Sequence, residues 1–253
     1  MQTIYEPKGK AKEYGELALN IYTGCPHGCT YCYAPSVLRR DKPDFHTNVM
    51  PRENILAETK KRLSKGDIKG KEIFLCFTCD PFPNGIDCSV TYDIIKAIKE
   101  SGNRVAILTK GKVDCDLLFS ILDSNDRFGI TLSCNSKIAK TQEPNAETPY
   151  ERIKNISAAK DKGIKTFVSF EPVLQASYVY SLIANGGDII DEYRIGKLNY
   201  HDSPIPWKEF GETCEYLCKS HGRKYLIKEG LRAEMSNLAD KRKGKHDTNQ
   251  AIY

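Results

Sequence analysis

The sequence predicts an α/β protein whose parallel strands form a partial (β/α)6 barrel, similar to part of a TIM barrel, with a short C-terminal extension. Strand-like apolar runs alternate with amphipathic helix-like runs along most of the chain. Repeated strand–helix units imply a parallel sheet, and six or more units in one run favour a barrel or part of one. Polar and sulfur-containing residues also gather where the strands are expected to end, as at the rim of such a barrel.

The first unit begins with the apolar run 17–22, which predicts a strand. A loop rich in cysteine follows it, and the next helix is expected over residues 51–64. Pro51 suits the first position of that helix, and Gly66 suits its end.

The later units repeat this order. Runs rich in β-branched and aromatic residues predict strands, and apolar residues three or four positions apart predict helices. The expected strands are residues 72–78, 104–109, 128–133, 165–170, 188–194 and 224–227. The expected helices are residues 91–99, 113–122, 150–162, 174–184 and 207–221.

We therefore expect three segments. Residues 1–15 form an N-terminal extension, and residues 16–200 form the core barrel. Residues 201–253 supply a helix, a strand and a basic tail that close the barrel.

The composition is that of a protein with a sizeable core and no membrane span. Of the 253 residues, 40% are hydrophobic and 28% are charged. No run of about 18 apolar residues occurs, and the first residues lack the apolar core of a secretion signal. The ten cysteines could suggest extracellular disulfides. The long chain without a signal, and the metal-like spacing of three cysteines, favour a reducing cytoplasm instead.

The net charge of +5 is distributed unevenly. Basic residues are concentrated in 60–71 and again in 241–246. Such regions can bind the phosphate backbone of DNA or RNA. The alternative is a solvated helix face and a frayed tail, both of which are common on protein surfaces.

Cys25, Cys29 and Cys32 are spaced C-x3-C-x2-C directly after the first predicted strand. Three thiolates this close suit an iron–sulfur cluster or a soft metal ion. They are one fewer than a closed cluster or structural zinc site needs, so one metal position is expected to stay open for a reacting ligand. The alternative is a zinc site completed by His27 or His46.

The cysteine motif, with the aromatic Tyr31 before its last member, resembles the signature of the radical S-adenosylmethionine (radical SAM) superfamily. Further motifs resemble the second, third and fourth strand ends of its spore photoproduct lyase-like branch; these are Thr78-Cys79-Asp80, Leu108-Thr109-Lys110 and Leu132-Ser133-Cys134-Asn135. The resemblance continues through Glu143-Pro144, Arg152 and Phe170-Glu171-Pro172-Val173, and covers roughly residues 18 to 175. Parts of the chain also resemble short radical SAM proteins of phages and mobile elements.

The resemblance implies a [4Fe–4S] cluster held by the three cysteines and S-adenosylmethionine (SAM) bound at the open iron. Reductive cleavage of SAM would give a 5′-deoxyadenosyl radical that takes a hydrogen atom from a substrate. It also implies an electron donor of the flavodoxin or ferredoxin type.

Seven further residues are expected to bind the cofactor. These are Tyr31, Asp80, Lys110, Ser133, Asn135, Arg152 and Glu171. Asp80 would receive the SAM amino group, and Lys110 would neutralise the SAM carboxylate. Small polar groups at Ser133 and Asn135 would meet the ribose hydroxyls and the methionine end of SAM.

Each of these residues also has a structural interpretation. Ser133 and Asn135 suit turn chemistry after a strand. Arg152 suits an ion pair with Glu143. Asp80 suits an Asp-Pro turn, Lys110 a surface position, and Glu171 a loop before proline.

The resemblance also points to Cys76 and Cys79 as catalytic thiols. In the lyase, the cysteine that donates hydrogen lies two residues before the aspartate. Thr78 occupies that position here, so the thiol is shifted to Cys79 or to Cys76, which should share a strand face with Thr78.

Cys214, Cys218 and His221 are spaced C-x3-C-x2-H on a predicted helix, which suggests either a second metal site or core packing. The substrate is unassigned: nucleic acid is the first expectation and a peptide or protein is the second. A non-catalytic iron–sulfur or zinc-binding module is the remaining alternative.

Overall fold

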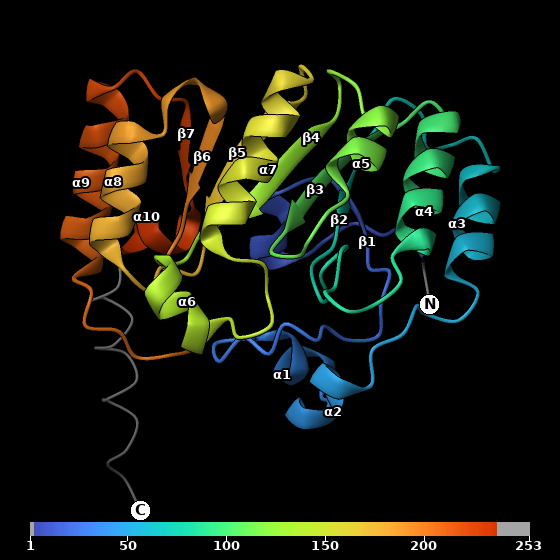
Figure 1. Ribbon diagram of the computed structural model, residues 1–253, viewed down its shortest axis with the longest axis horizontal. Coiled ribbons are helices and arrows are strands. Elements are labelled where there is room, and N and C mark those ends of the chain that lie inside the picture. Colours follow the sequence, from blue (N-terminus) through green and yellow to red (C-terminus); the bar gives the residue numbers. More distant parts are fainter. Residues whose placement is uncertain (1–2, 237–253) are drawn as a thin grey trace, which may run out of the picture.

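A seven-stranded, all-parallel sheet forms the centre of the molecule in the computed structural model, which describes residues 3–236 (Figure 1). The strands follow one another in chain order, and β1 and β7 remain the two edges. This open sheet confirms the predicted partial barrel of parallel strands, and the strand predicted in the C-terminal extension joins it as β7. The strands are β1 (Leu17–Leu19), β2 (Glu72–Leu75), β3 (Arg104–Thr109), β4 (Arg127–Thr131), β5 (Lys165–Phe170), β6 (Glu192–Ile195) and β7 (Tyr225–Ile227).

The long helices cover one face of this sheet (Figure 1). They are α3 (Ile55–Leu63), α4 (Ser89–Glu100), α5 (Cys115–Ile121), α7 (Pro149–Asp161), α8 (Ala176–Asn185) and α9 (Trp207–Ser220). The shorter elements are η1 (Gly9–Glu13), α1 (Ala34–Leu38), α2 (Lys42–Thr47), α6 (Ser136–Gln142), η2 (Gly187–Ile189) and α10 (Glu229–Met235). None of the helices in residues 3–236 has the length and apolar character needed to cross a membrane.

The element boundaries differ from the predicted ones mainly at the carboxyl ends of the strands. The strand predicted over residues 72–78 ends at Leu75, so Cys76 and Thr78 belong to the following loop and not to one strand face. The helix predicted from Pro51 begins only at Ile55. Segments as short as α1 and α2 carry too few residues to show helical periodicity, and the sequence did not predict them.

Successive side chains along a strand point to opposite faces of the sheet, so the apolar residues form two separate clusters. On β2, Ile73 and Leu75 belong to the large core beneath the helices, whereas Phe74 belongs to a small cluster on the inner face. Phe167 lies on that inner face beside Gly129 of the neighbouring strand. A Cβ at Gly129 would lie 2.3 Å from the Phe167 ring, so glycine makes room for the aromatic side chain.

The N-terminal segment crosses the inner face of the sheet. Tyr5 forms an antiparallel bridge with Ala18 of β1. Further on, Tyr14 packs within the inner cluster, and its ring lies 5.1 Å from that of Phe74. Glu13 then accepts a hydrogen bond from the backbone N–H of Glu229, just beyond β7. Residues 5–14 therefore connect both edges of the open sheet from the side that the long helices leave free (Figure 1).

Candidate active site

The loop after β1 carries the three cysteines and is braced from two directions. The backbone N–H of Cys25 donates to the Phe45 carbonyl at 3.2 Å, and His46 Nδ1 lies 2.7 Å from the Cys25 carbonyl. A Cβ at Gly24 would lie 2.1 Å from the Phe45 carbonyl oxygen, so this close approach requires glycine. Asn145 supports the other side of the loop by donating to the Pro26 carbonyl at 2.9 Å. Both His46 and Asn145 thus act on the backbone of the loop.

All three cysteines line a cavity of about 670 Å³ at the carboxyl ends of the strands. The pKa of each thiol is raised, to about 11 for Cys29, because burial disfavours the thiolate. The nearby Lys110 ammonium opposes this shift in each case but does not outweigh it. As bare groups they would stay protonated at neutral pH, and a bound cation would stabilise their thiolate forms. Three soft donors facing one cavity beside a lysine match the donor set of an iron–sulfur cluster.

Each histidine proposed for a zinc site uses one ring nitrogen in a contact with the backbone, and its other ring nitrogen is buried without a hydrogen-bond partner. His46 is held at the Cys25 carbonyl, as described above. His27 does line the cavity, and its Nε2 accepts a hydrogen bond from the Asn84 N–H at 3.2 Å. Within residues 3–236, no three cysteine, histidine or acidic side chains converge as a site for a single metal ion. Each thiolate of a cluster binds a different iron, so the cluster accommodates thiols that are further apart.

Asp80 joins the ends of β2 and β3. One carboxylate oxygen accepts from Thr109 Oγ1 at 2.5 Å and from the Phe82 N–H at 2.9 Å. The other accepts from the Lys110 N–H at 2.8 Å. Asp80 lines the cavity, and its carboxylate fixes the turn that presents Lys110.

The Lys110 side chain enters the same cavity, and its Nζ lies 6.0 Å from the centre of the Tyr31 ring. Burial by itself lowers the pKa of Lys110, but its interactions with Cys29, Glu143 and Asp80 outweigh burial and raise the pKa above its usual value. The side chain therefore carries a positive charge next to the cysteine loop.

Three predicted pocket residues lie off the cavity lining. Arg152 is 1% exposed and donates to Glu143 at 2.6 Å and to the Thr131 carbonyl at 2.9 Å. Asn135 caps α6 by accepting from the Ile138 N–H at 3.1 Å. Ser133 is buried with its Oγ 3.3 Å from the Tyr31 hydroxyl. The contacts of Arg152 and Asn135 match the ion-pair and turn interpretations, whereas Ser133 contacts Tyr31 of the cysteine loop. Arg152 acts on the site through Glu143, which accepts a hydrogen bond from Tyr31.

Cys76 and Cys79 both line the cavity, together with Thr78. The backbone N–H of Tyr22 donates to Cys79 Sγ at 3.4 Å. Burial raises the pKa of Cys76 well above its usual value. Burial also acts to raise the pKa of Cys79, but the Cys76 thiol and backbone N–H groups outweigh it and lower the pKa.

Glu171 lies in a second polar group within the same cavity. It accepts hydrogen bonds from Lys228 and from Asn199, the latter at 3.0 Å. Tyr14 donates to the same carboxylate at 3.4 Å. Asn199 and Lys228 follow β6 and β7, where polar residues of such a barrel are expected. No sequence signal pointed to Tyr14 or to Lys10, which reach the cavity from the N-terminal segment.

The remaining sequence candidates lie elsewhere. Cys214 and Cys218 are fully buried in the large core and His221 is exposed, which matches core packing. In the first basic region, Arg62 pairs with Asp67 at 2.5 Å and Lys71 with Glu16 at 3.0 Å, as on a solvated surface. The second basic region, residues 241–246, lies outside the described residues.

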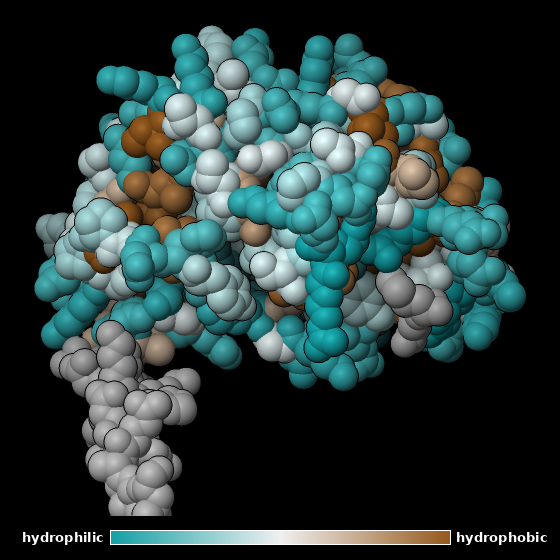
Figure 2. Space-filling model, turned by 90° about the horizontal axis from the view of Figure 1, so that it is seen from below, coloured by the Kyte–Doolittle hydropathy of each residue, from teal (hydrophilic) through white to brown (hydrophobic). Residues whose placement is uncertain are grey.

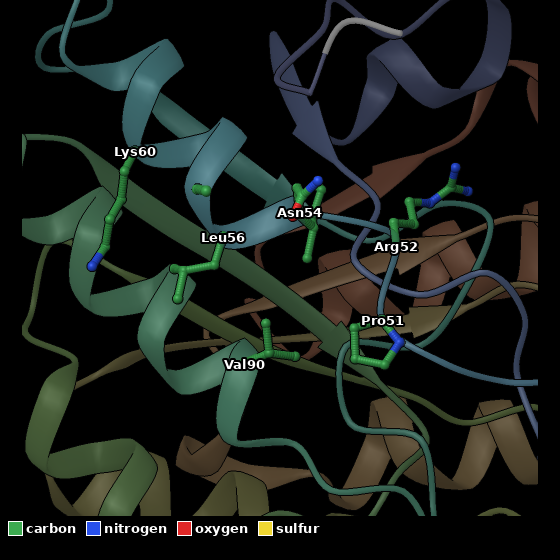
Figure 3. A pocket seen from close by; sticks show the side chains of 8 residues that line it. Pro51, Arg52, Asn54, Leu56, Lys60 and Val90 are labelled. Carbon is green, nitrogen blue, oxygen red and sulfur yellow. The ribbon is translucent and has the colours of Figure 1, made fainter.

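A second hollow of about 450 Å³ lies between α3 and the start of α4 (Figure 3). It is lined by Pro51, Arg52, Asn54, Ile55, Leu56, Ala57, Lys60 and Val90. This lining contains neither sulfur nor an acid, so the chemically reactive groups belong to the larger cavity. Viewed from the side on which α1 and α2 lie, the surface is mainly hydrophilic, and its hydrophobic side chains form separate patches (Figure 2).

Comparison with known sequences identifies relatives of this chain. The family model of the radical SAM superfamily matches residues 19–175. An uncharacterized protein of Methanocaldococcus jannaschii is 27% identical over 226 residues, which cover 84% of this chain and 79% of that protein. An uncharacterized protein of Mycobacterium tuberculosis is 26% identical over 166 residues, which cover 62% of this chain and 49% of that protein. The chain thus spans about half the length of this mycobacterial relative.

Solved structures share the fold. A spore photoproduct lyase mutant with bound AdoMet and dinucleoside spore photoproduct has a TM-score of 0.65 at 16% identity, covering 87% of this chain and 78% of that one. Streptococcus suis SuiB bound to S-adenosylmethionine has a TM-score of 0.62 at 14% identity, covering 86% of this chain and 52% of that one. Because the family model matches more than half of the sequence, the chain belongs to the radical SAM superfamily, whose enzymes use a [4Fe–4S] cluster and S-adenosylmethionine.

Proposed function

We propose that Cys25, Cys29 and Cys32 hold the [4Fe–4S] cluster and that SAM binds beside it in the cavity of about 670 Å³. When bound, these cofactors supply reductive cleavage of SAM to a 5′-deoxyadenosyl radical. The single observation that carries the proposal is that three thiols free of disulfides and the Lys110 ammonium line one cavity.

The side chains around the cluster have separate roles in this proposal. Lys110 neutralises the carboxylate of SAM, and Asp80 holds the backbone of Lys110 in position. Tyr31 is fixed by Glu143 and covers the cysteine loop. Arg152 keeps Glu143 ionised in a buried position, so it supports the pocket without touching the cofactor.

Cys76 is our candidate for the thiol that returns a hydrogen atom to the substrate radical. Hydrogen-atom donation requires an S–H group, and burial keeps Cys76 protonated. Transfer of the hydrogen atom breaks the S–H bond, forms a C–H bond on the substrate and leaves a thiyl radical on sulfur. Cys79 is the second candidate, since it lines the same cavity.

Nucleic acid is the substrate class that we favour. The fold is shared with spore photoproduct lyase solved with a dinucleoside spore photoproduct, and lysines 8 and 10 line the cavity. A peptide is the second candidate, because SuiB bound to its precursor peptide SuiA has a TM-score of 0.63 to this chain. We further propose a flavodoxin- or ferredoxin-type electron donor and a reducing cytoplasm, in keeping with ten free cysteines in the described residues.

The test is SAM cleavage under anaerobic conditions. Protein reconstituted with iron and sulfide and reduced with dithionite should convert SAM to 5′-deoxyadenosine. Cys29→Ala should lose the visible cluster absorbance and this product while it keeps its circular dichroism. Cys218→Ala serves as the control cysteine because it is remote from the cavity lining. A wild-type protein that binds the cluster but never cleaves SAM would refute the proposal.

A further inference from the structure

The part of the cavity formed by the ends of β5, β6 and β7 has a composition of its own. Glu171, Asn199 and Lys228 follow these strands. Lys10 reaches Asn199 from the N-terminal segment, and Lys8 lines the same cavity. We propose that this part is a nucleobase-binding subsite, with Tyr200 as a stacking surface and the two N-terminal lysines as phosphate contacts. This inference rests on the proposed function, because it names the substrate class of the same cavity.

The floor of the subsite is a buried ion pair. Lys228 is 3% exposed, contacts the Glu171 carboxylate, and lies 4.3 Å above the Tyr14 ring. A buried ion pair contributes little net stability compared with apolar residues of the same volume, so stability alone does not account for it. Here it holds the carboxylate and the Asn199 amide together at the cavity wall.

This floor suits a neutral, planar ligand. Lys228 contacts the Glu171 carboxylate and also lies 3.4 Å from Glu13 Oε2, so an anionic ligand group gains no strong attraction there. The Asn199 amide nitrogen donates to Glu171 and to the Lys197 carbonyl, and its oxygen accepts from Lys10 and can accept one more hydrogen bond from a ligand. The edge of a nucleobase carries donors and acceptors side by side and matches such a surface.

Tyr200 supplies an aromatic surface at the cavity. Its side chain is 78% exposed, although its neighbours Leu198 and Asn199 are partly buried. Its φ of +66° lies in the left-handed region, which is costly for a residue with a Cβ. The loop therefore presents this ring to solvent at a conformational cost, and exposed aromatic rings are the usual stacking partners of unpaired bases.

Lys8 and Lys10 provide the charge that a peptide would not require. Both side chains are exposed and both line the cavity. Lys10 Nζ donates to Asn199 Oδ1 at 2.6 Å and lies 5.8 Å from the centre of the Tyr200 ring. A phosphate bound here would lie next to a base stacked on Tyr200. This pairing of cations with an aromatic ring favours a single-stranded nucleic acid over a peptide.

The test separates base recognition from phosphate attraction. Cluster-loaded protein with SAM, kept anaerobic and unreduced, is titrated into a fluorescein-labelled thymidine oligonucleotide, an abasic oligonucleotide of the same length, and a neutral peptide. Fluorescence anisotropy gives each affinity. We expect the thymidine oligonucleotide to bind more tightly than the abasic one, and Tyr200→Ala to reduce this preference about tenfold.

Two further variants make the result specific. Lys10→Met should weaken both oligonucleotides equally and reduce the dependence of log K on log salt by about one unit. Lys224→Met is the control, since Lys224 is 75% exposed and pairs with Glu192 at the opposite end of β7; it should leave the base preference unchanged. Circular dichroism verifies that each variant is folded.

Three outcomes would overturn the inference. These are equal binding of base-containing and abasic oligonucleotides, an unchanged preference in Tyr200→Ala, and tight binding of the peptide alone. Binding is measured without reductant, so failure here leaves 5′-deoxyadenosine formation as a separate test of the proposed function.

Discussion

Lys110 is the residue whose charge most directly couples the cysteine loop to a ligand. Its ammonium lowers the pKa of all three cysteine thiols, and Asp80 fixes its backbone. A cation in this position can serve the bound cluster and a SAM carboxylate at the same time.

We therefore expect Lys110→Met to weaken SAM binding by about tenfold or more, since hydrogen bonds to charged groups are worth about 1.5–3 kcal/mol. Iron content should change little, because the three thiols remain. Equilibrium dialysis with labelled SAM and an iron assay measure the two effects. Lys112→Met is the control, as Lys112 is exposed two residues away. Equal losses of SAM binding in both variants would contradict this role.

At the residue level, the sequence predicted the cavity residues that belong to a spaced motif or follow a predicted strand. It missed those that lie outside any motif or periodic pattern. The cysteine spacing and the strand-end position of Lys110 led to residues that line the cavity. Ser133 and Asn135 also follow a strand, but Asn135 caps α6 and Ser133 contacts Tyr31, and spacing cannot distinguish such contacts from ligand contacts. Tyr14 lies in a segment without periodicity, so only its packing reveals it.

The ion pair between α7 and the loop after α6 connects two elements behind the cysteine loop. Arg152 and Glu143 are both buried, and Glu143 also accepts from Tyr31. Removing one partner leaves a buried charge without compensation.

Arg152→Met should therefore lower the free energy of unfolding by about 3–5 kcal/mol. Lys154→Met removes an exposed pair with Glu151 on the same helix and should cost about 0–1 kcal/mol. Urea unfolding of the metal-free proteins provides both values. Similar losses of unfolding free energy in the two variants would show that the buried pair stabilises the fold no more than the exposed pair.

Glu192, at the start of β6, makes the stability of the folded protein depend on pH. Burial by itself raises the pKa of Glu192, but Arg194 at 2.7 Å and Lys224 at 3.3 Å outweigh it and lower the pKa. A carboxyl with a lowered pKa in the folded state stabilises the protein above its unfolded pKa of about 4.3. That stability is lost as the pH falls through the folded pKa.

Glu192→Gln should accordingly be less stable than wild type at pH 7, and the difference should shrink as the pH falls from about 5 to about 3. Urea titrations across this range measure it. Asp188→Asn, a neighbouring change without an ion pair among the described contacts, provides the baseline. A wild-type advantage that stays constant with pH would exclude this coupling.

The order of elements was predictable because periodicity changes clearly between strands and long helices. All seven predicted strands occur, and their parallel order follows from the helices between them. The short helices α1 and α2 were not predicted, since five or six residues do not complete two turns. They nevertheless position the site, because Phe45 and His46 of α2 hold the loop at Cys25.

At the scale of the whole molecule, the N-terminal segment completes both the core and the cavity. Tyr14 packs against Phe74 and Phe77 on the inner face, and its hydroxyl lies 2.8 Å from Ser169 Oγ. The same segment brings Lys10 to Asn199, on the far side of the open sheet from β1. Folding of this segment therefore assembles the subsite that receives the substrate in our proposal.

Tyr14→Ala should cost about 3–5 kcal/mol of unfolding free energy, because a large buried ring is replaced by a cavity. Tyr14→Phe keeps the ring and should cost about 0.5–1.5 kcal/mol, the usual worth of one hydrogen bond. Tyr216→Ala, at a position that is 69% exposed, should stay within about 0.5 kcal/mol of wild type. Urea unfolding monitored by circular dichroism ranks the three variants. Unfolding of Tyr14→Ala and Tyr216→Ala at the same urea concentration would mean that the N-terminal segment is only loosely packed on the inner face of the sheet. The segment could then not be the element that completes the core and the cavity.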